Sequence, residues 1–300
     1  DAANTGLGDA ADPPRLRMDD PDDWLALLDP GPPVSPAMGE DEVALHLYTS
    51  GSTGRPKGVP LTHGGYVWAT ELLVRTAPPL AGKRALIAAP LFHMNGLLQS
   101  LMTGVAGGTV VLLCRFTARD YLETAARLKC DLLTSVLALR EGDVLDRIDL
   151  SHVQIITTGS APSTEAMFDD VHAAFPNARL MNGWGTTESS PVAFGAHPDG
   201  KPRPKMSIGY PMAEAEWRLV DGPDETEGVL WVKNRAMMPG YLNLPGETAK
   251  RIVDGWYDTG DVMRHDADGF FYFVGRADDM FVCGGENVYP GEVEKLLAQH

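Results

Sequence analysis

The chain has 300 residues, of which 44% are hydrophobic, and this composition is typical of a globular protein with one large core or two domains. Its 41 acidic residues outnumber the 25 lysines and arginines and give a formal net charge of −16. That charge makes nucleic acids and anionic membranes poor candidate partners, whereas a nucleotide requires only a few local cations and backbone amides.

The patterns after an acidic, proline-rich leading segment (residues 1–42) alternate between apolar strands and helical stretches. They predict strands over residues 43–48, 84–90, 109–114, 131–136, 153–160 and 178–185. They predict helices over residues 63–78, 95–108, 117–130 and 163–176. Such alternation indicates an α/β fold with a doubly wound, mainly parallel sheet over residues 43–208. In such sheets ligands bind at the carboxyl ends of the strands.

The segment 96–114 is uncharged over about the length that spans a bilayer. It contains four glycines and several polar residues, and it divides at Gly107-Gly108. These features favour a buried helix followed by a buried strand, and therefore a soluble chain without a membrane span.

The pattern changes after Gly209 to short stretches punctuated by turns, with no long helix between them. This arrangement predicts an antiparallel β subdomain over residues 209–275. Residues 276–300 read as a hinge loop and the start of a further small domain, whose helix is entered through Pro290.

Three cysteines, Cys114, Cys130 and Cys283, are widely separated along the chain. Their spacing forms neither a metal-binding pair nor a disulfide framework, and it favours a reducing, cytoplasmic location. The first residues show no signal-peptide pattern. Because the chain does not begin with Met and its last ten residues resemble a helix in progress, we expect both ends to be incomplete.

The loop YTSGSTGRPKG, residues 48–58, combines hydroxyl side chains and glycines with one cation, Lys57. Backbone amides, hydroxyls and an ammonium group together suit a polyphosphate. The loop differs from a Walker motif because Lys57 lies between Pro56 and Gly58 instead of between Gly and Ser or Thr. The alternative is a flexible surface loop.

Three further loops carry residues suited to a nucleotide. In NGWGTTESSP, residues 182–191, Trp184 is flanked by glycines that leave its indole free for a flat ring, while Thr187 and Glu188 suit a phosphate oxygen and a divalent ion. In GWYDTGD, residues 255–261, a carboxylate could accept hydrogen bonds from ribose hydroxyls. Taken alone, the segment 182–191 is equally well a strand-end turn with a packed Trp. The segment 255–261 and the third loop, the Arg-Ala-Asp-Asp run at 276–279, are ordinarily turns when taken alone.

These four loops, in this order, resemble signature segments of the adenylate-forming superfamily, which includes acyl- and aryl-CoA synthetases, luciferases of the firefly type and adenylation domains of peptide synthetases. PLFHMNGL, residues 90–97, and TGSAP, residues 158–162, resemble two more. The match extends from about Val43 to the last residue. Members of this superfamily join a carboxylic acid to the α-phosphate of ATP as an acyl-adenylate and then transfer the acyl group to a thiol, usually that of CoA.

The resemblance implies a role for each matching residue. Those cradling the β- and γ-phosphates would be Thr49, Ser50, Gly51, Ser52, Thr53, Gly54 and Lys57. Trp184 would stack on adenine, where the family usually has Tyr, with Gly159, Ser160, Ala161 and Gly185 nearby. Thr187 would contact the α-phosphate and Glu188 would bind Mg²⁺. Asp261 and Arg276 would bind the ribose. The catalytic residues would be Lys57, His93, Thr187 and Glu188.

The resemblance also implies an acyl pocket, a hinge and a path for CoA. The pocket would be lined by His93, beside the acyl carboxylate, and by Met94, Asn95 and Gln99. Asp278 matches the hinge position about which the family's C-terminal domain rotates, and Gly284 and Gly285 lie where the CoA arm would pass. ATP, Mg²⁺ and CoA are the implied cofactor and co-substrates.

The chain departs from the family pattern in three places. Most of the C-terminal domain is missing, including a lysine that binds the carboxylate and the α-phosphate. Much of the N-terminal region is also missing, and residues 132–143 are a few residues short. We therefore expect strongly reduced adenylation from this chain alone.

Three functions remain open at this stage. The first is an acyl-CoA or aryl-CoA ligase, favoured by the CGGENVYPGEVE segment. The second is an adenylation domain or acyl-AMP ligase that loads a carrier protein, and the third is a non-catalytic AMP-binding module. Asn95 and Gln99 suit a polar or aromatic acid, whereas GTTESSPV equally suits a fatty acid.

Overall fold

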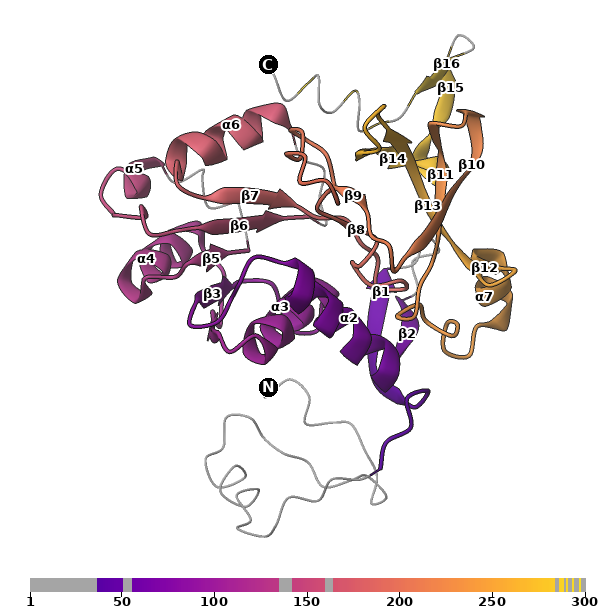
Figure 1. Ribbon diagram of the computed structural model, residues 1–300, viewed down its shortest axis with the longest axis horizontal. Coiled ribbons are helices and arrows are strands. Elements are labelled where there is room, and N and C mark those ends of the chain that lie inside the picture. Colours follow the sequence, from indigo (N-terminus) through magenta and orange to yellow (C-terminus); the bar gives the residue numbers. More distant parts are fainter. Residues whose placement is uncertain are drawn as a thin grey trace. The chain divides into compact units, whose positions relative to one another are not determined.

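The computed structural model describes residues 37–50, 56–134, 142–159, 164–283 and 286–288, and positions 290, 293 and 297. The chain divides into two units, residues 1–38 and 39–300. All elements named below belong to the second unit, which Figure 1 shows in colours that follow the sequence.

A five-stranded sheet in which every neighbouring pair is parallel confirms the predicted α/β core. Its strands lie in the order β4-β3-β5-β6-β7. Their bounds are Thr109–Leu112 (β4), Arg84–Ile87 (β3), Leu132–Leu133 (β5), Ile155–Thr158 (β6) and Arg179–Asn182 (β7). The strands are short apolar runs, as expected where helices cover both faces of a parallel sheet.

Alternate residues of these strands contribute to two different core clusters. Leu86, Leu133 and Ile156 pack with α4 (Ala118–Leu128) and α6 (Glu165–Ala174). Their neighbours in sequence pack instead with α2 (His63–Thr76) and α3 (Met94–Val105). Because successive side chains of a strand point to opposite faces, the sheet is doubly wound, and Figure 1 shows α2 and α3 on the side away from α6.

Thr117, the first residue of the predicted helix 117–130, caps the start of α4. The side chain of Thr117 accepts a hydrogen bond from the backbone N–H of Asp120 at 3.1 Å, and Lys129 ends the helix in the left-handed conformation at φ 50°. A one-turn helix, α5 (Gly142–Leu145), lies between α4 and β6.

The strand predicted at residues 43–48 exists, but it lies outside the parallel sheet. As β1 (Val43–Ser50) it pairs antiparallel with β2 (Pro56–Thr62), a strand that the sequence analysis did not predict. Thr49 and Lys57 are partners in this register. Leu47, Val59 and Leu61 bury the inner face of the hairpin in the same core as the antiparallel sheet.

The predicted antiparallel β subdomain is confirmed as a second five-stranded sheet. The strands are β10 (Glu216–Asp224), β11 (Glu227–Lys233), β12 (Ile252–Val253), β13 (Trp256–His265) and β14 (Phe271–Arg276), ordered β10-β11-β13-β12, with β14 also paired to β13. A short helix, α7 (Pro245–Arg251), precedes β12 and was not predicted.

Four short strands complete the described elements. β8 (Phe194–Gly195) pairs with β9 (Tyr210–Pro211), and β15 (Phe281–Cys283) pairs with β16 (Glu286–Val288) after a 3-10 turn, η3 (Ala277–Asp279). The uncharged segment 96–114 divides between α3 and β4, as predicted. Among the described residues, no helix is long and apolar enough to cross a membrane.

Candidate nucleotide site

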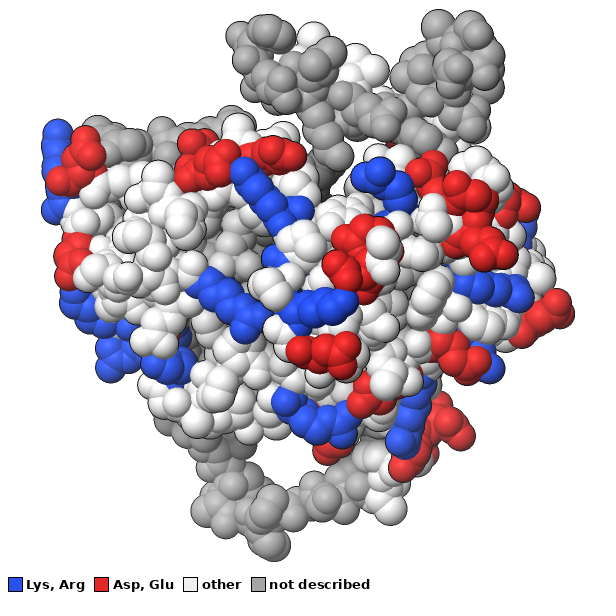
Figure 2. Space-filling view, turned by 45° about the horizontal axis from the view of Figure 1, so that its top comes forward, with Lys and Arg blue, Asp and Glu red and all other residues white. Residues whose placement is uncertain are grey.

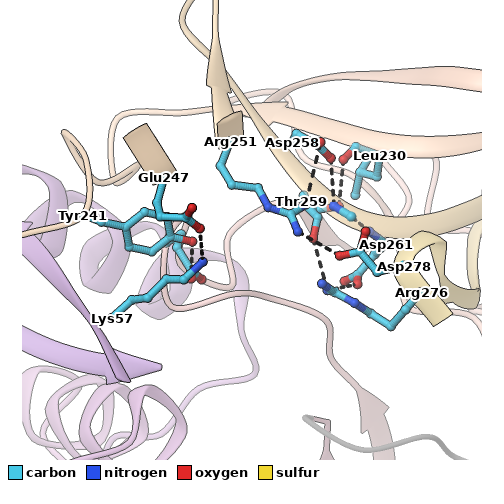
Figure 3. Close-up of polar contacts among 12 residues, drawn as sticks. Lys57, Leu230, Tyr241, Glu247, Arg251, Asp258, Thr259, Asp261, Arg276 and Asp278 are labelled. Carbon is cyan, nitrogen blue, oxygen red and sulfur yellow. Dashed lines mark hydrogen bonds and ion pairs between the residues drawn. The ribbon is translucent and has the colours of Figure 1, made fainter. Parts of the chain in front are cut away.

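Residues from three different sheets meet at the candidate site. The β1–β2 hairpin supplies Thr49 and Lys57, the loop after β7 supplies Trp184 and Glu188, and β13 supplies Asp261. Figure 3 shows two clusters of polar contacts among these and neighbouring residues, one around Lys57 and one around Asp261. Direct contacts therefore join residues up to 190 positions apart, as in the pair Lys57–Glu247.

Asp261 and Arg276, the predicted ribose-binding pair, lie opposite each other in the register of β13 and β14. Their side chains form an ion pair, and the second carboxylate oxygen of Asp261 accepts a hydrogen bond from the indole N–H of Trp184 at 2.8 Å. Asp261 is 6% exposed. Burial raises the pKa of its carboxyl, and the charge of Arg276 and the two hydrogen bonds oppose that rise.

The Thr-Gly-Asp run is part of a strand, and the prediction of a loop or turn here was wrong. It forms an irregular stretch of β13, where the register with β11 shifts between Val229 and Trp231. Gly260 adopts φ +68°, a conformation that favours glycine, and a Cβ there would lie 2.8 Å from Nη1 of Arg251. The shift leaves Asp261 facing the loop after β7.

Thr259 holds this irregular stretch from inside. Its hydroxyl donates to the carbonyl oxygen of Leu230 at 2.7 Å and accepts from the N–H of Asp261 at 3.0 Å. Its carbonyl oxygen accepts from Arg276 at 3.1 Å. One buried threonine thus fixes both members of the candidate ribose-binding pair.

Trp184 is half-buried, and its indole is less free than the sequence suggests. Its N–H is engaged by Asp261, and its ring packs edge-to-face on Phe194 with centroids 5.6 Å apart. Of the two flanking glycines, Gly185 leaves no room for a Cβ, which would lie 2.3 Å from the Cβ of Pro191, whereas a Cβ on Gly183 would make an ordinary contact, 3.6 Å from the carbonyl oxygen of Thr158. Stacking of Trp184 on adenine stays a prediction.

Glu188, the predicted magnesium ligand, is 8% exposed and sits at the centre of a hydroxyl cluster. Its Oε1 accepts from the hydroxyl of Tyr241 at 2.9 Å and from that of Thr49 at 3.4 Å. The pKa of Tyr241 and that of Tyr257 are both raised, first by burial and then by the charge of Glu188. The carboxylate is therefore oriented by hydroxyl donors that stay protonated.

A single carboxylate is compatible with magnesium only if the nucleotide supplies other ligands. Among the described residues, no group of three or more His, Cys, Asp or Glu side chains is placed to hold a metal. Mg²⁺ is usually bound through one or two carboxylates together with substrate phosphates and water. The oxygen donors of Glu188 and Thr49 fit that pattern.

Lys57 is 8% exposed and is held by α7 rather than by its own hairpin. Its Nζ lies 2.7 Å from Oε2 of Glu247 and 5.1 Å from the centre of the Tyr241 ring. Glu247 also binds Lys250 at 2.6 Å. Hydrogen bonds from Lys250 and Lys57 lower the pKa of Glu247 to about 2, so its carboxyl is ionised at neutral pH.

The predicted hinge residue, Asp278, is tied to the last residue of α7. Arg251 donates to its Oδ2 at 2.9 Å and lies 3.7 Å from Oδ2 of Asp258 (Figure 3). Asp278 lies in η3, immediately after β14. The same short helix therefore contacts Lys57 near its beginning and Asp278 at its end.

The residues predicted to line the acyl pocket lie at the start of α3. His93 is exposed and stands just before the helix, with its ring 4.8 Å from that of Phe92. Met94 is buried and Asn95 is half-buried. Gln99 reaches β6, where its Nε2 lies 3.4 Å from the hydroxyl of Thr157, and its buried Oε1 has no hydrogen-bond partner in the part of the chain that the structure describes.

Two further predicted residues lie near the site. Ser50 ends β1, and Thr187 is half-buried and begins the turn that contains Glu188. The predicted residues that lie outside the described ones are Gly51, Ser52, Thr53, Gly54, Ser160, Ala161, Gly284 and Gly285.

Sequence reasoning missed four residues that surround the predicted ones: Tyr241, Glu247, Arg251 and Tyr257. The helix that carries two of them has a recognisable pattern, since Pro245 occupies its first turn, Glu247 follows, and basic residues end it. No local pattern marks Tyr241, whose contact with Glu188 joins residues 53 positions apart.

Figure 2 shows acidic and basic side chains interspersed on one face of the described chain, without a continuous basic patch. The cations that matter for the candidate site are individual ones, each paired with a carboxylate.

Known proteins similar to this chain include CoA ligases. Feruloyl-CoA synthase from Amycolatopsis sp is 36% identical, covering 91% of this chain and 57% of that protein, and indoleacetate–CoA ligase from Aromatoleum aromaticum is 32% identical, covering 89% and 54%. The chain thus spans just over half the length of these relatives.

Solved structures give the same result. An anthranilate CoA ligase in complex with anthranoyl-AMP superposes with a TM-score of 0.77 at 28% identity, covering 87% of this chain and 52% of that one. O-succinylbenzoate Coenzyme A synthetase from Bacillus subtilis, in complex with ATP and magnesium ion, superposes with 0.74 at 29% identity, covering 88% and 56%. The family model described as AMP-binding enzyme matches residues 5–242. The chain belongs to the AMP-binding enzymes of the adenylate-forming superfamily, which confirms the resemblance found in the sequence.

Proposed function

We propose that the protein containing this chain is an ATP-dependent acid–thiol ligase that activates a carboxylic acid as acyl-AMP and transfers the acyl group to CoA. The observation that carries the proposal is the convergence of Lys57, Glu188 and Asp261 from three sheets onto one site. Feruloyl-CoA synthase, 4-coumarate–CoA ligase and indoleacetate–CoA ligase are named for CoA ligation, which favours CoA over a carrier protein as the acceptor.

In this proposal each part of the site acts on one part of ATP. Asp261 accepts hydrogen bonds from the ribose hydroxyls, and Arg276 and Trp184 keep its carboxylate in place. Lys57 binds the terminal phosphates. Glu188, held by Tyr241 and Thr49, supplies a ligand for Mg²⁺, which when bound neutralises phosphate charge.

The chemistry depends on positioning and charge neutralisation rather than on an acid or a base. A carboxylate oxygen of the acid attacks the α-phosphorus, and the bond to pyrophosphate breaks as the acyl-AMP forms. The thiolate of CoA then attacks the acyl carbon and AMP leaves. Thr187 contacts the α-phosphate, and His93 lies beside the acyl carboxylate.

We further propose an aromatic acid as the substrate. Feruloyl-CoA synthase, 4-coumarate–CoA ligase from Oryza sativa and the anthranilate ligase are all named for acids with an aromatic ring. The polar groups of Asn95 and Gln99 suit a ring substituent that forms hydrogen bonds. The cysteine pattern supports a cytoplasmic location.

The decisive experiment measures pyrophosphate release and thioester formation by the full-length protein with ATP, Mg²⁺, CoA and a panel of aromatic and aliphatic acids. We expect release to depend on an aromatic acid and the thioester to be detected by mass spectrometry. Transfer to a holo carrier protein without formation of a CoA thioester would instead support the carrier-loading alternative. Absence of acid-dependent release with every member of the panel would refute the proposal.

A further inference from the structure

Lys57, the proposed partner of the terminal phosphates, already has an anionic partner. Its Nζ is 2.7 Å from Oε2 of Glu247, and the side chain of Lys57 is only 10% exposed. Figure 3 shows Lys57 extended toward Glu247 and the ring of Tyr241. A buried ammonium group without a counterion is strongly disfavoured, so this pair stabilises the position of Lys57 before a nucleotide binds.

Glu247 differs from Lys57 in having a second, exposed partner. Its Oε1 accepts from Lys250 at 2.6 Å, one turn further along α7, and the side chain of Lys250 is 72% exposed. If Glu247 moves away from Lys57, its charge is still compensated by Lys250 and by water. The two carboxylate oxygens thus connect a buried cation with a solvent-exposed one.

We propose that Glu247 is an exchangeable counterion, which pairs with Lys57 in the absence of nucleotide and is replaced there by the terminal phosphates of ATP. This inference rests on the proposed function, because it takes Lys57 as the residue that binds the triphosphate. The exchange swaps one anionic partner of Lys57 for another and leaves Glu247 with Lys250. Glu247 therefore competes with the β- and γ-phosphates and lowers the affinity for ATP and pyrophosphate, but leaves the affinity for AMP unchanged.

The test compares nucleotides that have or lack the terminal phosphates. Dissociation constants of ATP, pyrophosphate and AMP are measured by calorimetry in the presence of Mg²⁺. We expect E247Q to bind ATP and pyrophosphate about three- to tenfold more tightly than the wild type, with AMP binding unchanged. We expect K250Q to bind ATP more weakly, because Glu247 then has only Lys57 as a cationic partner.

A matched control is the Lys233–Glu216 pair of β10 and β11, with Nζ and Oε1 at 3.0 Å. E216Q also removes one carboxylate from an ion pair, and it should leave the affinities for all three ligands unchanged. Thermal melting establishes that each variant is folded. K250Q keeps the inference testable if E247Q does not fold, because Lys250 is largely exposed.

Weaker ATP binding by E247Q would overturn the inference, because it would make Glu247 a positioning residue for Lys57. Unchanged ATP binding would also overturn it, because it would show that no exchange occurs. An equal change in ATP and AMP affinity would also overturn it. Failure of the proposed function gives a different result, because replacement of Lys57 by methionine would then leave ATP binding intact.

Discussion

Replacement of the Thr259 hydroxyl tests how the irregular stretch of β13 positions the candidate ribose-binding pair. In Thr259→Val the side chain keeps its branched shape but loses the oxygen that bonds to Leu230 and Asp261. Thr259 is 2% exposed, so water has little access to the groups left behind. The carbonyl of Leu230 and the N–H of Asp261 would each lose the hydroxyl as a partner.

The expected cost follows from these two contacts. A typical hydrogen bond contributes about 1 kcal/mol net, and a buried polar group left unsatisfied costs about 1–3 kcal/mol. We therefore expect Thr259→Val to lower the free energy of unfolding by about 2–4 kcal/mol. Thr259→Ser keeps the hydroxyl and removes one methyl group, which costs about 1 kcal/mol.

The assay is urea unfolding monitored by tryptophan fluorescence, combined with calorimetric measurement of AMP binding. We expect valine to cost more stability than serine and to weaken AMP binding, because the N–H of Asp261 is no longer anchored. A serine variant as destabilised as the valine variant would refute the reasoning, since it would show that the methyl group rather than the hydroxyl stabilises this stretch.

Three other predictions concern a close contact, a carboxylate partner and pH. Gly185→Ala should destabilise the protein by about 1–3 kcal/mol in urea unfolding, because its Cβ would lie 2.3 Å from that of Pro191. Gly104→Ala, in open space on a helix, should instead stabilise the protein by about 0.5–1 kcal/mol. A Gly185→Ala variant more stable than Gly104→Ala would contradict the packing argument. Tyr241→Phe should cost about 1.5–3 kcal/mol and lower the melting temperature, because a hydrogen bond to a buried carboxylate is lost; an unchanged melting temperature would argue against that bond. The lowered pKa of Glu247, about 2 against 4.5, contributes stability that is present above pH 4.5 and lost as pH falls through 2. Melting temperatures of the wild type and E247Q should therefore converge over that range, and a constant difference would contradict the prediction.

Local signals predicted the parallel core well. The α4 helix combines a threonine cap with a strongly one-sided distribution of apolar residues, and both are properties of a short window of sequence. The short strands of the parallel sheet are apolar runs between turn residues, which is the pattern expected for strands covered on both faces. Such elements are determined by their own residues, so a single sequence is sufficient to find them.

Features that depend on contacts with another element were missed. No residue of α7 is buried, and its sequence has no apolar periodicity that would predict a helix. Only Pro245 and the order of its charged residues, acidic first and basic last, mark this helix. The strand β2 begins at Pro56, a residue that weakens any strand prediction, and it is stabilised by pairing with β1.

The residue types in the motifs predicted which residues form the site, but they did not predict the contacts that orient those residues. The motif positions of Lys57, Glu188 and Asp261 were predicted as parts of one site, and each has a contact there with a residue distant in the sequence. The partners that orient them, Tyr241 and Glu247, belong to no motif used in the prediction. Hydrogen bonds between segments far apart in the chain leave no periodic trace in the sequence, and only the fold reveals them.

The origin of the site in three sheets has a consequence for folding cooperativity. A nucleotide that contacts the β1–β2 hairpin, the loop after β7 and β13 binds only when all three are folded together. Its binding free energy then adds to the cost of unfolding any one of them, so local opening becomes less frequent even in strands that never touch the ligand. Hydrogen exchange of backbone amides in β10 and β11, measured with and without nucleotide, would report this spread of protection.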